Sequence, residues 1–185
     1  MDLLINTDTG RGSLMAELDT LYRLIILNLL EQSEYPLSNT RITGFMQGNS
    51  YTDYFTVQNS LSMLLESKLI RSEPTHGNTL YQITEEGRET LNFYHYKISE
   101  GIRADISAFL REHGSEIKKE IAARADYHRT PQGDYVVRCI RSEKDKTLMD
   151  LTLTVSSKEA AEAICLGWPD KNDTIFALIA DELIG

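Results

Sequence analysis

The chain has 185 residues, of which 41% are hydrophobic and 25% charged, and these values exclude a chain that is disordered throughout while allowing one substantial domain or two small ones. The formal net charge of −9 disfavours nucleic-acid binding, because much of the affinity for DNA comes from phosphate contacts by Lys and Arg. The first half is the more acidic one, since residues 1–95 hold 6 Lys and Arg against 12 Asp and Glu.

The N-terminal segment is expected to be a flexible arm followed by a helix. Residues 1–16 include Gly10, Gly12 and Ser13 and show little periodicity. Asp19 can then cap a helix that runs to about Gln32. The apolar residues of this helix cover most of its circumference, which predicts that it is buried on more than one side.

A second, short helix is expected after a break at Tyr35-Pro36. Ser38 is a good N-cap for this helix, which should end near Gln47. Leu37 precedes the cap and Ile42 occupies the fourth helical position, which is the spacing of a hydrophobic staple. The sequence therefore predicts a well-defined start for the second helix.

The third helix is expected from about Thr52 or Asp53 to Lys68. Its apolar residues recur at i, i+4, i+7 and i+8, which predicts one buried stripe made of Val57, Leu61, Leu64 and Leu65. Gln58 then lies on the flank of the helix. The opposite, outward side carries Thr52, Phe55, Thr56, Asn59, Met63 and Glu66.

A β-hairpin is expected directly after the third helix. Strands at 69–74 and 79–83 flank the turn Thr75-His76-Gly77-Asn78, whose glycine suits a positive φ. Thr84 is a good N-cap for the next helix. That helix is expected to be long and to end near His113-Gly114, and a shorter one should span about Ser115 to Ala125.

The C-terminal part is expected to form a small antiparallel sheet with two helices. Segments 134–141 and 148–155 alternate as strands do, and 127–130 is a candidate edge strand. Ser156 and Glu159 form a capping box for a helix that Pro169 should end near Trp168. A last helix should run from about Asn172 to Leu183. The apolar strand faces comprise Tyr135, Val137, Cys139, Leu151, Leu153 and Val155.

These elements predict an α+β protein. Three helices followed by a two-stranded wing form the winged variant of the helix-turn-helix. A long linking helix and a small C-terminal domain of antiparallel sheet and helices follow. The expected divisions are a flexible arm at 1–16, a winged-helix domain at 17–95, linking or dimerisation helices at 96–126 and an α/β domain at 127–185.

Two strings around the wing carry a resemblance to known proteins. Leu64-Leu65-Glu66-Ser67-Lys68-Leu69-Ile70 leads into the wing, and Leu80-Tyr81-Gln82-Ile83-Thr84-Glu85-Glu86-Gly87-Arg88 returns from it. Over residues 19–95 the chain resembles bacterial winged-helix regulators of the PadR and MarR kind, which implies DNA binding. The whole chain also resembles a bacterial winged-helix family of unknown function with a small α/β extension, and that likeness implies no activity.

The candidate DNA contacts follow from this arrangement. The N-terminal end of a recognition helix usually reads the bases, which points to Thr52, Thr56 and Asn59, with Gln58 beside them. Phosphate contacts would come from Arg41, Arg71, and His76 or Asn78 at the wing tip, although His76 can equally be a plain turn residue. The third helix has no Lys or Arg before Lys68, so its outward side can also be a solvated polar face.

The long helix after the wing is a candidate dimer interface. Relatives of the resembled kind commonly dimerise through elements that follow the wing, and a symmetric dimer would place two recognition helices about one DNA turn apart. The apolar stripe that would form this interface comprises Tyr94, Ile98, Ile102 and Phe109. The same stripe can instead pack against the C-terminal sheet.

No enzymatic activity, cofactor or metal is expected. The four histidines lack metal-ligand spacing, and the sequence contains no Gly-rich phosphate loop and no nucleophile elbow. Cys139 and Cys165 are far apart and fit two buried side chains in a reduced, cytoplasmic compartment. The segment Met1–Arg11 does not resemble a signal peptide. Trp168, Tyr135, Cys139 and Phe176 either line a small pocket or form a core.

Three hypotheses for function remain open at this point. The leading one is a dimeric DNA-binding transcriptional regulator that occupies a pseudo-palindromic operator and carries a C-terminal effector or assembly domain. The second is a winged-helix module that binds protein, which the acidic charge and the outward Phe55 and Met63 favour. The third is a small-molecule binding protein that uses the winged helix as a scaffold.

Overall fold

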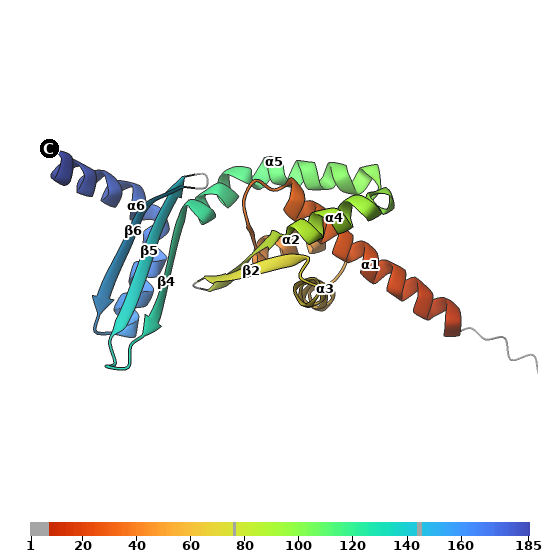
Figure 1. The fold of residues 1–185 in the computed structure, drawn as a ribbon, viewed down its shortest axis with the longest axis horizontal. Helices are drawn as coiled ribbons and strands as arrows, with labels where there is room; N and C mark the ends of the chain where they lie inside the picture. Colours follow the sequence, from red (N-terminus) through yellow and green to blue (C-terminus); the bar gives the residue numbers. More distant parts are fainter. Residues whose placement is uncertain (1–7, 76, 144–145) are drawn as a thin grey trace, which may run out of the picture. The chain divides into compact units, whose positions relative to one another are not determined.

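The computed structural model describes residues 8–75, 77–143 and 146–185, and the chain divides into two compact units. The first unit extends to Glu73 and includes Leu80–Glu112, and the second comprises Pro74–Thr79 and His113–Gly185. The α+β class is confirmed, because each unit combines helices with a small antiparallel sheet (Figure 1).

The first unit has the expected winged helix-turn-helix order. Its elements are α1 (Asp8–Gln32), β1 (Leu37–Ser38), α2 (Asn39–Gly48), α3 (Tyr54–Glu66) and most of β2 (Ile70–Thr75) and β3 (Asn78–Ile83), whose turn-side ends at Pro74–Thr79 group with the second unit. The strand order is β1-β3-β2, and Leu37 of β1 lies opposite Tyr81 of β3. The sequence did not predict β1, which closes the wing into a three-stranded sheet. The second half of α1 is buried on several sides, as expected. Its buried side chains are Leu24, Ile25, Ile26, Leu27, Leu29 and Leu30.

The expectation that Asp19 caps the first helix is wrong, because α1 already begins at Asp8. Asp19 lies inside the helix, where its carbonyl accepts the Arg23 Nε–H at 3.1 Å. The glycines at 10 and 12 do not prevent the helix, since each costs only about 1 kcal/mol relative to alanine. Met1–Thr7 lie outside the described residues, so the expectation of a flexible arm stays open there.

The expectation of one long helix from Thr84 to His113-Gly114 is also wrong. The chain forms α4 (Glu85–Tyr94), a single 3-10 turn η1 (His95–Lys97) and then α5 (Glu100–Ala122), which contributes residues to both units. Ser99 restarts the helix because its Oγ accepts the Ile102 N–H at 3.3 Å. Gly114 lies inside α5 with open space around it, so a glycine signal alone did not end the helix.

The second unit is a three-stranded sheet packed on one helix. Its strands are β4 (Ala123–Arg129), β5 (Tyr135–Glu143) and β6 (Lys146–Val155), in the order β4-β5-β6 and antiparallel throughout. Val137 and Cys139 of β5 lie opposite Leu153 and Leu151 of β6, which confirms the expected shared face. The buried core under α6 (Lys158–Ile184) comprises Ala123, Val137, Cys139, Ala161, Cys165 and Trp168.

Two expectations for α6 are wrong. Ser157, not Ser156, caps the helix by accepting the Ala160 N–H at 3.2 Å. The helix also continues through Pro169, and three residues later the buried Asn172 donates its side-chain amide to the carbonyl oxygens of Trp168 at 3.3 Å and Pro169 at 2.8 Å. The last turns of α6 point away from the sheet in Figure 1.

Candidate nucleic-acid interface

A network of side-chain hydrogen bonds joins α2 to α3. Asn39 donates to Gln58 Oε1 at 2.8 Å, and Gln58 donates to Asn39 Oδ1 at 3.0 Å and to Thr43 Oγ1 at 3.3 Å. The predicted base-reading residue Gln58 is therefore engaged within the protein. Asn39 and Thr43 were missed by sequence reasoning, although their position in the first turns of a well-capped helix was visible.

Both helices of the helix-turn-helix begin with a side-chain cap, of which the one at Ser38 was expected and the one at Asp53 was not. Ser38 Oγ accepts the Arg41 N–H at 3.3 Å at the start of α2. Asp53 Oδ1 accepts the Thr56 N–H at 2.8 Å at the start of α3. This backbone hydrogen bond holds the pKa of Asp53 below its usual value, so the cap is charged at neutral pH. The N-terminal N–H groups of α3 are thus already partly satisfied.

The predicted inward and outward sides of α3 are confirmed. Val57, Leu61 and Leu64 are buried, whereas Phe55 is 81% exposed. Among the three residues expected to read bases, Asn59 is exposed and Thr52 and Thr56 are half-buried. Asn59 is therefore the most accessible of the predicted base contacts.

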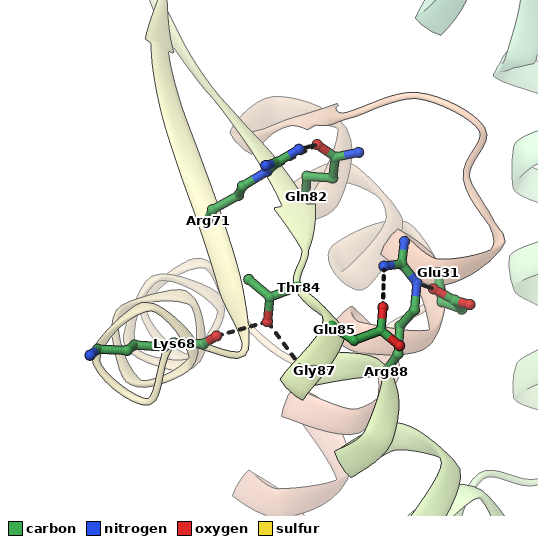
Figure 2. A network of polar contacts seen from close by, with 8 residues as sticks. All are labelled: Glu31, Lys68, Arg71, Gln82, Thr84, Glu85, Gly87 and Arg88. Atoms are coloured by element: carbon green, nitrogen blue, oxygen red, sulfur yellow. Dashed lines mark hydrogen bonds and ion pairs between the residues drawn. The ribbon is translucent and has the colours of Figure 1, made fainter. Parts of the chain in front are cut away.

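The wing carries one of the predicted phosphate contacts in a fixed orientation. Arg71 of β2 donates to Gln82 Oε1 of β3 through Nε at 3.2 Å and Nη2 at 2.5 Å (Figure 2). Arg71 is exposed, and Nη1 has no partner among the described residues. Asn78 accepts the Thr79 N–H at 2.9 Å and helps to close the turn. His76 lies outside the described residues.

Arg41 and Arg23 are the basic residues of α2 and α1 nearest to this surface. Arg41 is half-buried in the first turn of α2. Arg23 was not predicted as a site residue, yet its Nη1 lies 3.6 Å from Sδ of Met63 on α3. Its only sequence signal was a lone cation on an otherwise apolar stretch of helix. The flank of α3 thus receives a positive charge from α1.

Hydrogen bonds at the junction of α3, the wing and α4 involve residues of both strings that flank the wing. The Leu69 N–H reaches Leu64 O and the Lys68 N–H reaches Leu65 O, both at 2.9 Å, while Lys68 has φ of 58°. This is a Schellman motif with lysine in the left-handed position. Thr84 Oγ1 donates to Lys68 O at 2.8 Å and accepts the Gly87 N–H at 3.1 Å (Figure 2). Residues of the two strings around the wing therefore connect the end of α3 to the wing and to the start of α4.

Lys68→Gly is expected to raise the free energy of unfolding by about 0.5–1 kcal/mol, because glycine adopts the left-handed conformation without the penalty that a Cβ imposes. Lys68→Ala removes the same charge and keeps the penalty, so it serves as the matched control and should not stabilise. Urea unfolding followed by circular dichroism measures both variants. Equal stability of the two variants would contradict the assignment of backbone strain to Lys68.

The predicted dimer stripe is largely used within the first unit. Ile98 is 4% exposed, and the ring of Phe109 packs 5.1 Å from that of Phe45 on α2. Tyr94 and Ile102 are half-buried. Nearby, the hydroxyl of Tyr51 donates to the carboxylate of Asp105, and burial together with this contact raises the pKa of Tyr51. These contacts attach α5 to α2 and to the turn before α3.

The surface formed by α2, α3 and the hairpin is electrically neutral. Residues 39–83 contain three basic residues, Arg41, Lys68 and Arg71, and three acidic ones, Asp53, Glu66 and Glu73. The remaining acidic residues of the first half lie before α2 or in α4. The excess negative charge of the first half therefore lies on elements outside the candidate interface.

The second unit has an apolar pocket but no reactive cysteine. Cys139 and Cys165 are free and buried, and burial raises the pKa of both thiols, that of Cys165 to about 11. A pocket of about 280 Å³ lies between β6 and α6, lined mainly by Leu151, Leu153, Ile164 and Trp168. Phe176 instead stacks under Arg141, at 4.9 Å. In the described part of the chain, no group of His, Cys, Asp and Glu is arranged to hold a metal ion.

Comparison with known proteins yields one match. A family model described as a domain of unknown function (DUF4364) matches residues 22–183, which span both units. No curated protein and no solved structure matches the chain. Within the described residues, no helix is long and apolar enough to cross a membrane.

Proposed function

The chain belongs to the DUF4364 family, and we propose that it is a sequence-specific DNA-binding transcriptional regulator that acts as a dimer in the cytoplasm. The observation that carries the proposal is the winged helix-turn-helix of the first unit, with a third helix whose outward side exposes Phe55 and Asn59. The mechanism is occupancy of an operator and involves no chemistry.

The geometry of the helix-turn-helix supports this proposal. The Asn39–Gln58–Thr43 network holds α3 against α2, so the recognition helix is presented in one orientation. A preorganised helix avoids an ordering cost when it enters the major groove. Asn59 can form two hydrogen bonds with adenine, and the methyl group of Thr56 can contact thymine.

The distribution of charge is compatible with DNA on this surface. Arg71 extends from the wing, and Lys68 lies at the end of α3, so cations flank the recognition helix on the wing side. The neutral balance of residues 39–83 means that the approach of phosphate meets no net repulsion from this surface. Specificity would then depend on base contacts more than on charge.

Asn59→Ala is expected to lower the affinity for the operator by about 1–3 kcal/mol and to relax specificity at one base pair, because it removes a bidentate contact. Arg71→Ala should weaken binding to all duplexes alike and reduce the salt slope by about one. Fluorescence anisotropy over a salt series measures both effects. Ser62→Ala, an exposed change on the same helix, is the control. Parent-like binding by both site variants would contradict the proposed interface.

A second candidate function is a winged-helix module that binds protein. The exposed Phe55, whose ring packs edge-on against Tyr54 at 5.7 Å, favours it, because exposed aromatic pairs commonly anchor protein partners. Under this alternative, Phe55→Ala would abolish binding to a protein partner while Asn59→Ala and added DNA would have no effect. The two candidates are therefore separated by which of the two α3 variants loses binding.

A further inference from the structure

Helix α6 leaves part of the C-terminal sheet uncovered. It packs mainly on β4 and β5, where Ala123 and Ala125 allow a close approach. The larger Leu151 and Leu153 of β6 point to the same face but remain half-buried or exposed. They line the pocket of about 280 Å³ that runs beside α6. An apolar face therefore remains open on the β6 side of the helix.

The side of α6 that borders this pocket continues as a stripe toward the C-terminus. Lys171 and Ile175 line the pocket, and Leu178 and Glu182 follow them at the helical spacing i, i+4, i+7 and i+11. Leu178 is 63% exposed, which is unusual for a leucine that follows the pocket-lining Ile175 on the same side of the helix. The stripe has an apolar centre, with a positive charge at one end and a negative charge at the other.

We propose that this stripe binds the same stripe of a second copy of the chain, with the two α6 helices antiparallel. When Ile175 lies beside Leu178 of the second copy, Lys171 lies beside Glu182 of the second copy. Two-fold symmetry repeats both contacts, which gives two apolar and two opposite-charge pairs. The stripe complements itself in sequence order and in charge, which identifies a second copy as the occupant.

The pocket beside the stripe becomes part of the same interface. Helix α6 of the second copy lies over the side of Lys171 and Ile175, so it covers the open edge of the pocket near Leu151 and Leu153. Burying these side chains in a dimer removes apolar surface from water. This inference specifies which surface forms the dimer of the proposed function. It rests on the proposed function only for the use of that dimer in DNA binding.

The first test measures the mass of the full chain by light scattering at micromolar concentration. The parent is expected to be a dimer, and Leu178→Asp a folded monomer by circular dichroism. Leu166→Asp is the matched control, because Leu166 is 74% exposed on a different side of α6 and should leave the dimer intact. A monomeric parent, or a Leu178→Asp variant as dimeric as the parent, would overturn the proposal.

The second test exchanges the charges at the ends of the stripe. Lys171→Glu and Glu182→Lys should each weaken the dimer by about tenfold or more, because each creates two like-charge contacts. An equimolar mixture of the two variants should recover the parent's dimer affinity, because a heterodimer restores opposite charges at both ends. Failure of the mixture to recover would exclude the antiparallel pairing. Since no DNA is present, neither result depends on the proposed function.

Discussion

Gly87→Ala is expected to destabilise the first unit by about 3 kcal/mol, although it adds only one methyl group. A Cβ at Gly87 would overlap the carbonyl oxygen of Leu69 and lie 2.7 Å from Cγ1 of Ile83. That carbonyl also accepts the Thr84 N–H at 3.1 Å, so it cannot move away without weakening the bond that joins Leu69 to the N-cap residue of α4. Urea unfolding followed by circular dichroism measures the loss.

Gly114→Ala provides the matched control for this change. Gly114 also lies within a helix, but a Cβ there would meet nothing within 4 Å. The control should be stabilised by about 0.5–1 kcal/mol, which is the ordinary gain from replacing glycine in a helix. If both variants were stabilised alike, the close approach of α4 to Leu69 would be refuted.

Ile98→Asp is expected to unfold the first unit and not merely to separate a dimer. Ile98 is 4% exposed and lies between η1 and α5, so the new carboxylate would be buried without a partner. Such a change typically costs more than about 4 kcal/mol. Circular dichroism and light scattering together distinguish loss of structure from loss of mass.

Tyr96→Asp is the control for this second change, because Tyr96 is two positions away and 67% exposed. It should keep both the helical signal and the mass of the parent. If Ile98→Asp instead gave a folded monomer, the dimer interface would be the stripe formed by Tyr94, Ile98, Ile102 and Phe109. The structure leads us to expect the unfolded outcome.

The sequence predicted local features of the fold well wherever one residue has a dedicated backbone role. Ser38 and Thr84 were expected as caps, and both accept a backbone N–H at the start of a helix. The inward stripe of α3 and the shared face of β5 and β6 followed from their periods of 3.6 and 2. These signals depend on neighbours in the sequence, so no tertiary information was needed.

The errors arose where tertiary packing overrides a local signal. Proline and glycine often end helices, yet Pro169 and Gly114 both lie inside long ones, and beside Pro169 the Trp168 Nε1–H donates to Ile140 O of β5 at 3.0 Å, which attaches the helix to the sheet. At η1 the error was the opposite one: the sequence predicted a continuous helix, because apolar residues continue through this segment at helical spacing, but the helix is interrupted there. Only the packing of Ile98 and Phe109 in the first unit shows why the chain turns there.

The candidate site was predictable in outline but not in detail. The outward side of α3 followed from its periodicity, and Asn59 is exposed as expected. The engagement of Gln58 was not predictable, because it depends on how closely α2 approaches α3 and on which amide faces which. Likewise, the bond from Arg71 to Gln82 requires the register of the hairpin.

The neutral surface has a consequence for how DNA binding would be observed. The three cations of residues 39–83, Arg41, Lys68 and Arg71, give this surface a salt slope of about −3 per subunit, and Arg23 of α1 adds about one more where it also contacts phosphate. Non-specific binding should therefore be weak, and specific sites should stand out from the background. Capture experiments need moderate salt, since high salt would remove the few phosphate contacts.

The most direct measurement passes sheared genomic DNA from the source organism over the immobilised full chain at about 100 mM salt and sequences what is retained. We expect a few strongly enriched sites that share an inverted repeat, as a symmetric dimer with two recognition helices requires. Retention no greater than that of beads without protein would contradict DNA binding and leave the protein-binding module as the function of the winged helix.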